Sequence, residues 1–334
     1  MTETPDPTPL PLSLLDLAVA RPGEGAGEAI AQSVRLASVA EEEGFRRVWY
    51  AEHHNMPAIA SSATSVLIAH VAARTSTIRL GSGGVMLPNH SPLVIAEQFG
   101  TLAELHPGRI DLGLGRAPGT DQRTLQALRR SPDAAEHFPQ DVLELQGYLK
   151  GESRIPGIDA YPGKGTDVPL YILGSSAFGA QLAARLGLGY AFASHFAPQM
   201  LEHAARVYRE HFQPSADLAE PHFIAAANVI AADTEEEAQV QWERAKRDRI
   251  RMMLGRGRTL GDDEVEMLLD SPAGEQVLGM LARTAVGTGE TVAAWLRDFA
   301  AGVQADEVIV TTAAPDPAVR ERTLRILGEH VVRG

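Results

Sequence analysis

Three stretches between residues 46 and 119 decide the fold: RRVWYAEHH (residues 46–54), TIRLGSGGVMLPNHSP (residues 77–92) and GRIDLGLGRAPG (residues 108–119). In each stretch, an apolar run with β-branched or aromatic residues ends abruptly in glutamate, histidine, serine, glycine or arginine. The apolar run predicts a buried strand, and the polar end predicts the loop that follows it. In a barrel of parallel strands, catalytic residues lie in the loops after the C-terminal ends of the strands. We therefore expect the active site in this part of the chain.

The same alternation of strand and helix extends along the chain. The expected strands cover residues 12–19, 47–51, 77–81, 109–113, 170–173, 190–193, 223–231 and 307–311. The helices expected after them cover residues 28–43, 63–74, 92–105, 178–186, 198–211, 234–253, 291–301 and 317–331. This alternation is typical of parallel βαβ units, and it predicts an α/β protein with the (β/α)8 TIM barrel fold. A doubly wound open sheet stays the alternative, since alternation alone does not show that a sheet closes.

Two segments exceed a minimal barrel and are expected as insertions after strands 4 and 7. Residues 117–168 hold a predicted helix (residues 140–149) and a connection rich in glycine and proline. Residues 254–287 hold a glycine-rich turn and one or two predicted helices. Insertions of this length usually serve as lids or contact surfaces. We expect a single domain over residues 1–334, with a disordered start at residues 1–10.

The composition excludes several classes of protein. The 334-residue chain has 43 acidic and 30 basic side chains, and this net charge of −13 argues against nucleic acid or an anionic membrane as a partner. The chain has no cysteine, which removes disulfides, thiolate metal sites and a cysteine nucleophile. No apolar stretch approaches the roughly 20 residues of a membrane helix, and the first residues do not resemble a signal peptide. We expect a cytoplasmic protein.

AEHH (residues 51–54) ends the second expected strand. Neighbouring side chains of a strand point to opposite faces, so Glu52, His53 and His54 do not all reach one metal ion while extended. We expect no metal site, since no other histidine or cysteine cluster has ligand spacing. A histidine at a barrel mouth is suited to general acid–base chemistry. The alternative is that these residues only hydrogen-bond the loop backbone.

Glycine-rich segments end the third and fourth expected strands. GSGG (residues 81–84) indicates either a bulge with close approach to a flat ring, or a tight turn that needs positive φ. GLGRAPG (residues 113–119) lacks the last glycine of a dinucleotide-binding fingerprint, because Pro118 stands there. Arg116 either binds an anionic group or forms a surface ion pair.

LGSSAFG (residues 173–179) follows the fifth expected strand and begins a helix. Ser175 and Ser176 lie where the free N–H groups of a helix N-terminus favour a phosphate, although serine is also a common N-cap. Together with Arg116 after the fourth strand, they favour a phosphate-bearing cofactor more strongly than either feature does alone.

Other polar residues are weaker candidates for the barrel mouth. These are Glu97, His90, His137 and His195. Asp111 alternates with apolar neighbours on a strand, so we expect it to face the barrel interior and to need a partner there.

In this order, the segments resemble the bacterial luciferase-like flavin monooxygenase superfamily. The segments that carry the resemblance are VWYAEHH, IRLGSGGVMLPNHSPLVIAEQF, HPGRIDLGLGRAPG, PLYILGSSAFGAQLAARLGLGYAFASHFAP and VGTGETVAAWL. They are spread over most of the chain, and their joint pattern is specific, whereas each piece alone is not. The resemblance implies a TIM barrel that binds FMN, or in one branch the deazaflavin F420, at its C-terminal mouth.

By the same resemblance, His53 is the catalytic residue, and a cis peptide bond joins Gly83 to Gly84 behind the flavin ring. The cofactor-binding residues that it implies are Ser82, Gly83, Gly84, Glu97, Arg116, Gly174, Ser175 and Ser176. Arg116 and the serines would approach the flavin phosphate. Phe178 departs from the family pattern, since some members carry a hydroxyl-bearing residue at that position.

The resemblance implies an enzyme, a monooxygenase that uses reduced FMN and dioxygen on a small organic substrate. It also implies a homodimer and, where reduced flavin is delivered, a separate NAD(P)H:flavin reductase as a transient partner. The alternatives are an F420-dependent hydride-transfer oxidoreductase, a non-catalytic flavin-binding protein and, most remotely, a metal-dependent barrel hydrolase.

Overall fold

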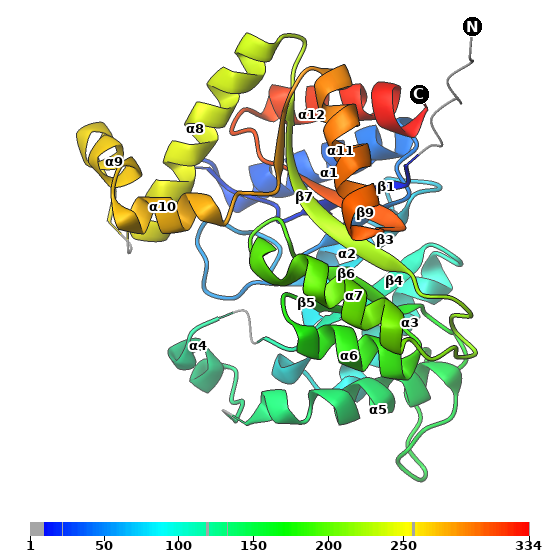
Figure 1. The fold of residues 1–334 in the computed structure, drawn as a ribbon. Helices are drawn as coiled ribbons and strands as arrows, with labels where there is room; N and C mark the ends of the chain where they lie inside the picture. Colours follow the sequence, from blue (N-terminus) through cyan, green and yellow to red (C-terminus); the bar gives the residue numbers. More distant parts are fainter. Residues whose placement is uncertain (1–9, 22, 118–119, 132, 256–257, 334) are drawn as a thin grey trace, which may run out of the picture.

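Eight parallel strands form a closed barrel (Figure 1). The computed structural model describes residues 10–21, 23–117, 120–131, 133–255 and 258–333. The barrel strands are β1 (Leu12–Asp16), β2 (Arg47–Tyr50), β3 (Arg79–Met86), β4 (Ile110–Gly115), β5 (Leu170–Gly174), β6 (Gly189–Phe192), β7 (Phe223–Ala231) and β9 (Glu307–Thr312). Each strand from β1 to β6 pairs with the next, β7 pairs with β9, and β9 pairs with β1. This closure confirms the predicted (β/α)8 TIM barrel and rules out the open sheet.

Helices surround the barrel (Figure 1). The main ones are α1 (Ala26–Glu42), α2 (Thr64–Ala72), α3 (Pro92–Leu105), α5 (Phe138–Lys150), α6 (Ala177–Leu186), α7 (Leu201–His211), α8 (Glu235–Leu254), α11 (Gly289–Val303) and α12 (Pro317–Leu327). Each covers the barrel with an apolar stripe; Leu36 of α1, Ile68 of α2 and Phe99 of α3, for example, are buried. Among the helices that the structure describes, none is long and apolar enough to cross a membrane.

The two predicted insertions carry short helices of their own. The first holds α4 (Gln122–Ala127) and a 3₁₀ turn before α5, and the second holds α9 (Asp262–Leu269) and α10 (Pro272–Gly279). A small apolar cluster separate from the main core packs α9 and α10 against the end of α8; it contains Ile250, Leu260, Val265 and Val277. In Figure 1, α4 and the α9–α10 pair both project on the left side of the barrel.

A ninth strand, β8 (Thr284–Gly287), was not predicted and lies within the second expected insertion. It pairs in parallel with the last four residues of β7, from Asn228 to Ala231. β6 pairs only with the first three residues of β7, from Phe223 to Ala225, so the rest of that edge is open to β8. With only four residues, β8 shows too little alternation in the sequence to be recognised as a strand.

The start of the chain differs from expectation in two ways. β1 ends at Asp16 rather than Val19, and Ala18 has a φ of 48°, which does not occur in a strand. Leu10, expected to be disordered, packs against the main core. Residues 1–9, the rest of the expected disordered start, lie outside the described residues.

Buried charges fill the N-terminal end of the barrel interior. Arg47 donates through Nη1 to Asp111 Oδ2 at 2.7 Å and through Nη2 to Glu307 Oε2 at 3.1 Å. Ser13 Oγ donates to Glu307 Oε1 at 2.5 Å. The Arg47 side chain is 1% exposed and both carboxylates are fully buried. The prediction that Asp111 faces the interior and has a partner there is therefore confirmed.

Glu307 is ionised in this interior. Burial raises its pKa, but the hydrogen bond from His222 and the charges of Arg47 and His222 outweigh burial and lower the pKa of Glu307 to about 2. For Arg47, burial acts against the charged form, and the carboxylates of Asp111 and Glu307 raise its pKa above the ordinary value. Removing one partner from such a buried group leaves an uncompensated charge, which typically costs about 3–5 kcal/mol.

We expect Glu307→Gln to lower the free energy of unfolding by about 3–5 kcal/mol, because Arg47 would lose one of its two countercharges in a dry interior. Urea unfolding at neutral pH measures the change. The matched control is Glu321→Gln, which removes a half-exposed carboxylate from an exposed pair with Arg35 and should cost under about 1 kcal/mol. Equal losses of unfolding free energy in the two variants would show that the buried position of Glu307 adds nothing to the cost of its removal.

Candidate functional site

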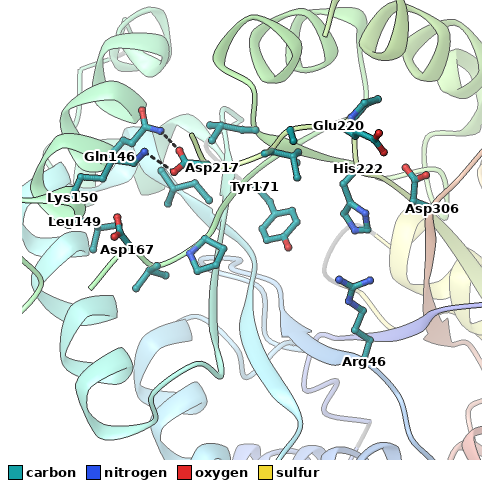
Figure 2. Close-up of a pocket in the computed structure, with 18 residues that line it drawn as sticks. Arg46, Gln146, Leu149, Lys150, Asp167, Tyr171, Asp217, Glu220, His222 and Asp306 are labelled. Carbon is teal, nitrogen blue, oxygen red and sulfur yellow. Dashed lines mark hydrogen bonds and ion pairs between the residues drawn. The ribbon is translucent and has the colours of Figure 1, made fainter. Parts of the chain in front are cut away.

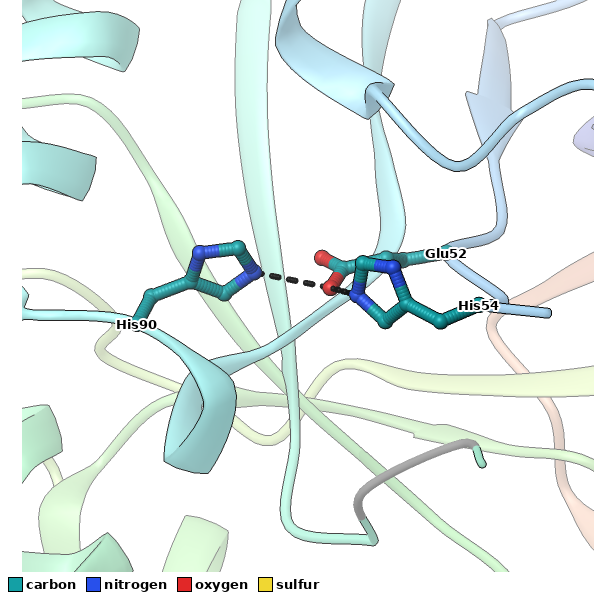
Figure 3. Close-up of side chains that lie close together, drawn as sticks. All are labelled: Glu52, His54 and His90. Atoms are coloured by element: carbon teal, nitrogen blue, oxygen red, sulfur yellow. Dashed lines mark hydrogen bonds and ion pairs between the residues drawn. The ribbon is translucent and has the colours of Figure 1, made fainter. Parts of the chain in front are cut away.

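A buried carboxylate joins the loops after β2 and β3 (Figure 3). Oε1 of Glu52, which is 2% exposed, accepts hydrogen bonds from His54 Nε2 and His90 Nε2, both at 2.7 Å. Its Oε2 accepts from the Met86 amide at 3.2 Å. Both imidazoles therefore meet at one oxygen of the same carboxylate. The structure thus brings His90, a weak candidate from sequence, directly into the group that AEHH begins.

His53, the predicted catalytic residue, lies in the loop after β2. Its side chain is partly buried, and its carbonyl accepts a hydrogen bond from Ser62 Oγ at 2.8 Å. His53 and Arg249 both act electrostatically on His195. These three residues come from the loop after β2, from α8 and from the loop after β6, so three separate elements converge at the C-terminal end of the barrel.

His195 is an uncharged imidazole at this end. Its carbonyl accepts from Asn228 Nδ2 at 2.7 Å, and its Nδ1 is buried with no hydrogen-bond partner among the described residues. Burial, with smaller effects of the charges of Arg249 and His53, lowers the pKa of His195 to about 3. At neutral pH the ring is therefore uncharged, and one of its nitrogens can accept a hydrogen bond from a bound molecule.

Arg249 was missed in the sequence. It lies on α8, burial lowers its pKa, and no carboxylate in the described part of the chain pairs with it. The helical spacing of the sequence could have revealed it. Ala238, Trp242 and Ala245 belong to the apolar cluster under α8. Position 249 falls on the same face of the helix. A cation on a core-facing stripe, with no partner carboxylate, is suited to binding an anion.

The GSGG segment lies inside β3, which continues to Met86 rather than ending at Gly81. The peptide bond of Gly83–Gly84 is cis, as the resemblance implies. The register of β3 against β4 shifts between Ser82 and Val85, so this stretch is a bulge rather than a turn.

Gly81, Gly83 and Gly84 do not have positive φ. Glycine is needed in this segment because neighbouring strands approach closely. A Cβ at Gly84 would lie 2.7 Å from the carbonyl oxygen of Gly113, and one at Gly81 would lie 2.7 Å from that of Asp111. The fully buried Ser82 Oγ donates to the Gly113 carbonyl at 2.8 Å. The Ser82 side chain is therefore committed to the contact between β3 and β4.

The loops after β4 and β5 meet at the N-terminus of α6. The guanidinium carbon of Arg116 lies 4.1 Å from the centroid of the Phe178 ring, so Phe178 holds this arginine in a cation–π contact. Ser176 is the N-cap of α6, but its hydroxyl makes no capping hydrogen bond. Ser175 and Ser176 follow Gly174, the last residue of β5, and both are exposed. An arginine, two available hydroxyls and the free N–H groups of a helix form a set that fits a phosphate.

Two other candidates are Glu97 and His137. Glu97 is partly buried within α3, and His137 is exposed before α5. The structure shows no hydrogen bond or ion pair between either side chain and the groups at the C-terminal end, as far as its residues are described. Their predicted proximity to the site stays a prediction.

A cavity of about 610 Å³ opens at the other end of the barrel (Figure 2). Its lining includes Arg46, Tyr171, His222 and Asp306, which lie at or before the N-terminal ends of β2, β5, β7 and β9. In barrels of this kind the N-terminal end contributes stability, and the C-terminal loops carry the chemistry. We therefore place the candidate active site at the C-terminal end, away from this cavity.

The low pKa of His195 predicts acid sensitivity. An imidazole with a pKa of about 3 in the fold and about 6.5 when unfolded adds no pH dependence above pH 6.5, and it lowers stability progressively between pH 6.5 and pH 3. At pH 5 this cost is about 2 kcal/mol. His195→Gln should therefore lose less stability than the native chain between pH 7.5 and pH 5 in urea unfolding, whereas His203→Gln, at an exposed position, should not differ. Identical pH dependence in all three proteins would show that His195 titrates normally.

Comparison with known proteins identifies relatives over most of the chain. A family model described as luciferase-like monooxygenase matches residues 10–305. A luciferase-like monooxygenase of Escherichia coli (strain K12) is 57% identical over 228 residues, which are 68% of each chain. The N-acetyl-S-alkylcysteine monooxygenase of Bacillus subtilis (strain 168) is 32% identical over 342 residues, which cover 96% of this chain and 98% of that protein.

Solved structures share the fold. The crystal structure of apo-MsnO8 superposes with a TM-score of 0.86 at 35% identity, covering 96% of this chain and 98% of its own. A type II Baeyer–Villiger monooxygenase from the CAM plasmid of Pseudomonas putida, in complex with FMN, has a TM-score of 0.70 at 18% identity and covers 97% and 98%. An F420-dependent secondary alcohol dehydrogenase with an F420-acetone adduct has a TM-score of 0.68 at 15% identity and covers 98% and 100%. The last two show the fold alone.

The family match spans nearly the whole barrel, and the relatives at 57% and 32% identity are named as monooxygenases. The chain is therefore an enzyme that belongs to the family of luciferase-like monooxygenases.

Proposed function

We propose that this enzyme is a flavin-dependent monooxygenase that uses reduced FMN and dioxygen to oxidise a small organic molecule. The observation that carries the flavin part of the proposal is the set of groups at the N-terminus of α6. Arg116 is held there by Phe178, and the hydroxyl of Ser176 makes no capping bond, so both are available to a phosphate. Family membership supports the monooxygenase part.

The residues of the chain would bind and orient the cofactor, and reduced FMN, when bound, supplies the electrons that activate dioxygen. Arg116 would neutralise the phosphate while Ser175 and Ser176 donate hydrogen bonds to it. His53 would hold or transfer a proton at a ring nitrogen near the reacting atoms. The neutral ring of His195 would accept a hydrogen bond. The helices of the two insertions would exclude water from the mouth.

For the substrate, we propose first a thioether that carries a carboxylate. One relative is named for N-acetyl-S-alkylcysteine. A molecule of that kind has a thioether to oxidise and a carboxylate, which needs a cationic partner in a site that excludes water. Arg249, which no described carboxylate neutralises, is the residue of the mouth that fits this task.

We also propose a homodimer formed through α2 and α3. Val66 on α2 is 68% exposed, and Val94 and Leu105 on α3 are 42% and 64% exposed. The two helices contact each other, so these side chains lie on neighbouring elements. Exposed apolar groups that gather in one area mark contact surfaces. A cytoplasmic location and a separate NAD(P)H:flavin reductase as electron source stay part of the proposal.

The second candidate function is F420-dependent hydride transfer. A structure with the same fold holds an F420 adduct, and a helix N-terminus with an arginine would suit the phosphate of either cofactor. A non-catalytic flavin-binding protein would be the third; the presence of His53 beside His195 and Arg249 argues against it.

A titration with FMN, reduced FMN and F420, followed by oxygen-consumption assays, tests the function. We expect saturable binding of reduced FMN and, with a flavin reductase and an N-acetyl-S-alkylcysteine, substrate-dependent oxygen uptake. His53→Gln should bind FMN normally and turn over about 10²- to 10⁴-fold more slowly, because it removes the proton-transfer group. His203→Gln serves as the exposed control. Binding of F420 alone would assign hydride transfer, and binding of neither cofactor would leave only the fold shared with the family.

A second test isolates the phosphate. We expect Arg116→Gln to weaken FMN binding by about 10- to 100-fold, since a charge-assisted hydrogen bond typically contributes about 1.5–3 kcal/mol. Riboflavin, which has the same ring and no phosphate, should bind the variant and the native chain alike. Arg123→Gln, at an exposed position of α4, is the matched control. Equal weakening of FMN and riboflavin would move Arg116 away from the phosphate.

A further inference from the structure

Glu52, His54 and His90 bring one oxygen and two nitrogens into a small volume (Figure 3). Oε1 of Glu52 lies 2.7 Å from each Nε2, and the three atoms lie within 4.8 Å of one another. The two rings are tilted by 46° with centroids 6.4 Å apart, so they approach the carboxylate from different directions. Two imidazole nitrogens with one carboxylate oxygen are a donor set that divalent first-row transition metals bind.

The burial and charge of this cluster favour a cation. The Glu52 carboxylate is 2% exposed, and across the described residues no lysine or arginine forms an ion pair with it. The side chains of His54 and His90 are 18% and 28% exposed, so they lie at the opening while the carboxylate lies beneath them. A divalent ion bound between the three side chains would supply a countercharge to this carboxylate.

The cluster is also held in position. The Met86 amide donates to Glu52 Oε2 at 3.2 Å and leaves Oε1 directed at the two rings. Glu52 follows β2 and His90 follows β3, and β2 pairs with the first four residues of β3, so the ligands come from neighbouring strands of the barrel. Such supporting contacts around metal ligands typically raise affinity about 10- to 100-fold.

Coordination requires the carboxylate oxygen to separate slightly from each ring nitrogen. A tetrahedral ion with metal–ligand distances of about 2.0–2.2 Å separates its ligand atoms by about 3.3 Å. The present separations of 2.7 Å would therefore widen slightly, within the reach of two partly exposed imidazoles. Each ring would bind through Nε2 and carry its proton on Nδ1, so a neutral imidazole changes tautomer and loses no proton.

We propose that Glu52, His54 and His90 form a binding site for a divalent transition-metal ion of the Zn²⁺ class. Three protein ligands leave at least one position for water, which is the arrangement of an open site rather than a structural one. This departs from the expectation of no metal. That expectation rested on the alternating neighbours within AEHH and on spacing in the sequence, whereas His90 lies 38 residues after Glu52 in the chain.

Calorimetric titration of the chelator-treated, tag-free chain with Zn²⁺ tests the proposal. We expect one ion per chain, and weaker binding at pH 5.5 than at pH 7.5, because protonated imidazoles do not bind metal. Glu52→Gln, His54→Gln and His90→Gln should each weaken binding at least about tenfold. Co²⁺ in place of Zn²⁺ should give visible absorption bands that the same three variants remove.

Two controls test whether the effect is specific to the cluster and whether each variant folds. His203→Gln removes an exposed histidine of α7 and should bind Zn²⁺ like the native chain. Circular dichroism identifies any variant that fails to fold, and the two histidine variants then carry the test. Absence of saturable binding by the native chain would overturn the proposal, as would unchanged affinity in folded variants of His54 and His90. Because no flavin is present, these outcomes are independent of the proposed monooxygenase activity.

Discussion

The barrel depends on one buried cation that is shared between carboxylates of two other strands. Arg47 of β2 contacts Asp111 of β4 and Glu307 of β9, and Ser13 of β1 completes the hydrogen bonds of Glu307. These groups meet only when the sheet is closed and each strand is in register. Apolar contacts tolerate small displacements, whereas a buried charge left without its partner is strongly unfavourable. We infer that this network specifies the closed arrangement more than it adds to stability.

At the opposite end of the barrel the Glu52 carboxylate is hydrogen-bonded, but two other polar groups lack partners within the described chain. Nδ1 of His195 is buried and unpaired, and no carboxylate neutralises Arg249. The Ser176 hydroxyl does not cap its own helix. Unmet polar groups cost free energy in an isolated protein, and a ligand that satisfies them recovers that cost. These groups support a site at the C-terminal end.

Sequence reasoning was strongest where local pattern and tertiary environment agree. The apolar run of β7 and the proline-initiated helix α3 have the predicted bounds, because both are long and strongly patterned. Asp111 was predicted to face inward with a partner, since a lone carboxylate on an apolar strand has few other solutions. These inferences needed only neighbouring residues and general rules of burial.

The failures have a different origin, since each depends on contacts between distant segments. β8 exists because β6 leaves part of the β7 edge open, which no local pattern records. The need for glycine at Gly81 and Gly84 comes from the close approach of β4, and the sequence left a turn equally plausible. The position of His90 next to Glu52 depends on the pairing of β2 with β3. The cofactor-binding residues stay predictions, because their role depends on a molecule rather than on the chain.

The position of His53 follows from its two neighbours in the chain. Glu52 is anchored by the Met86 amide, and the His54 ring is anchored by Glu52, so the loop is held on both sides of His53. A proton-transfer residue needs a defined distance to the reacting atom. Contacts on either side of His53 fix the loop, so the His53 side chain is not needed to anchor it. The same contacts bring His54 and His90 to one carboxylate oxygen. A cation at that oxygen would therefore act on the loop that carries His53, the residue predicted to be catalytic, and its binding would be coupled to the chemistry proposed for the mouth.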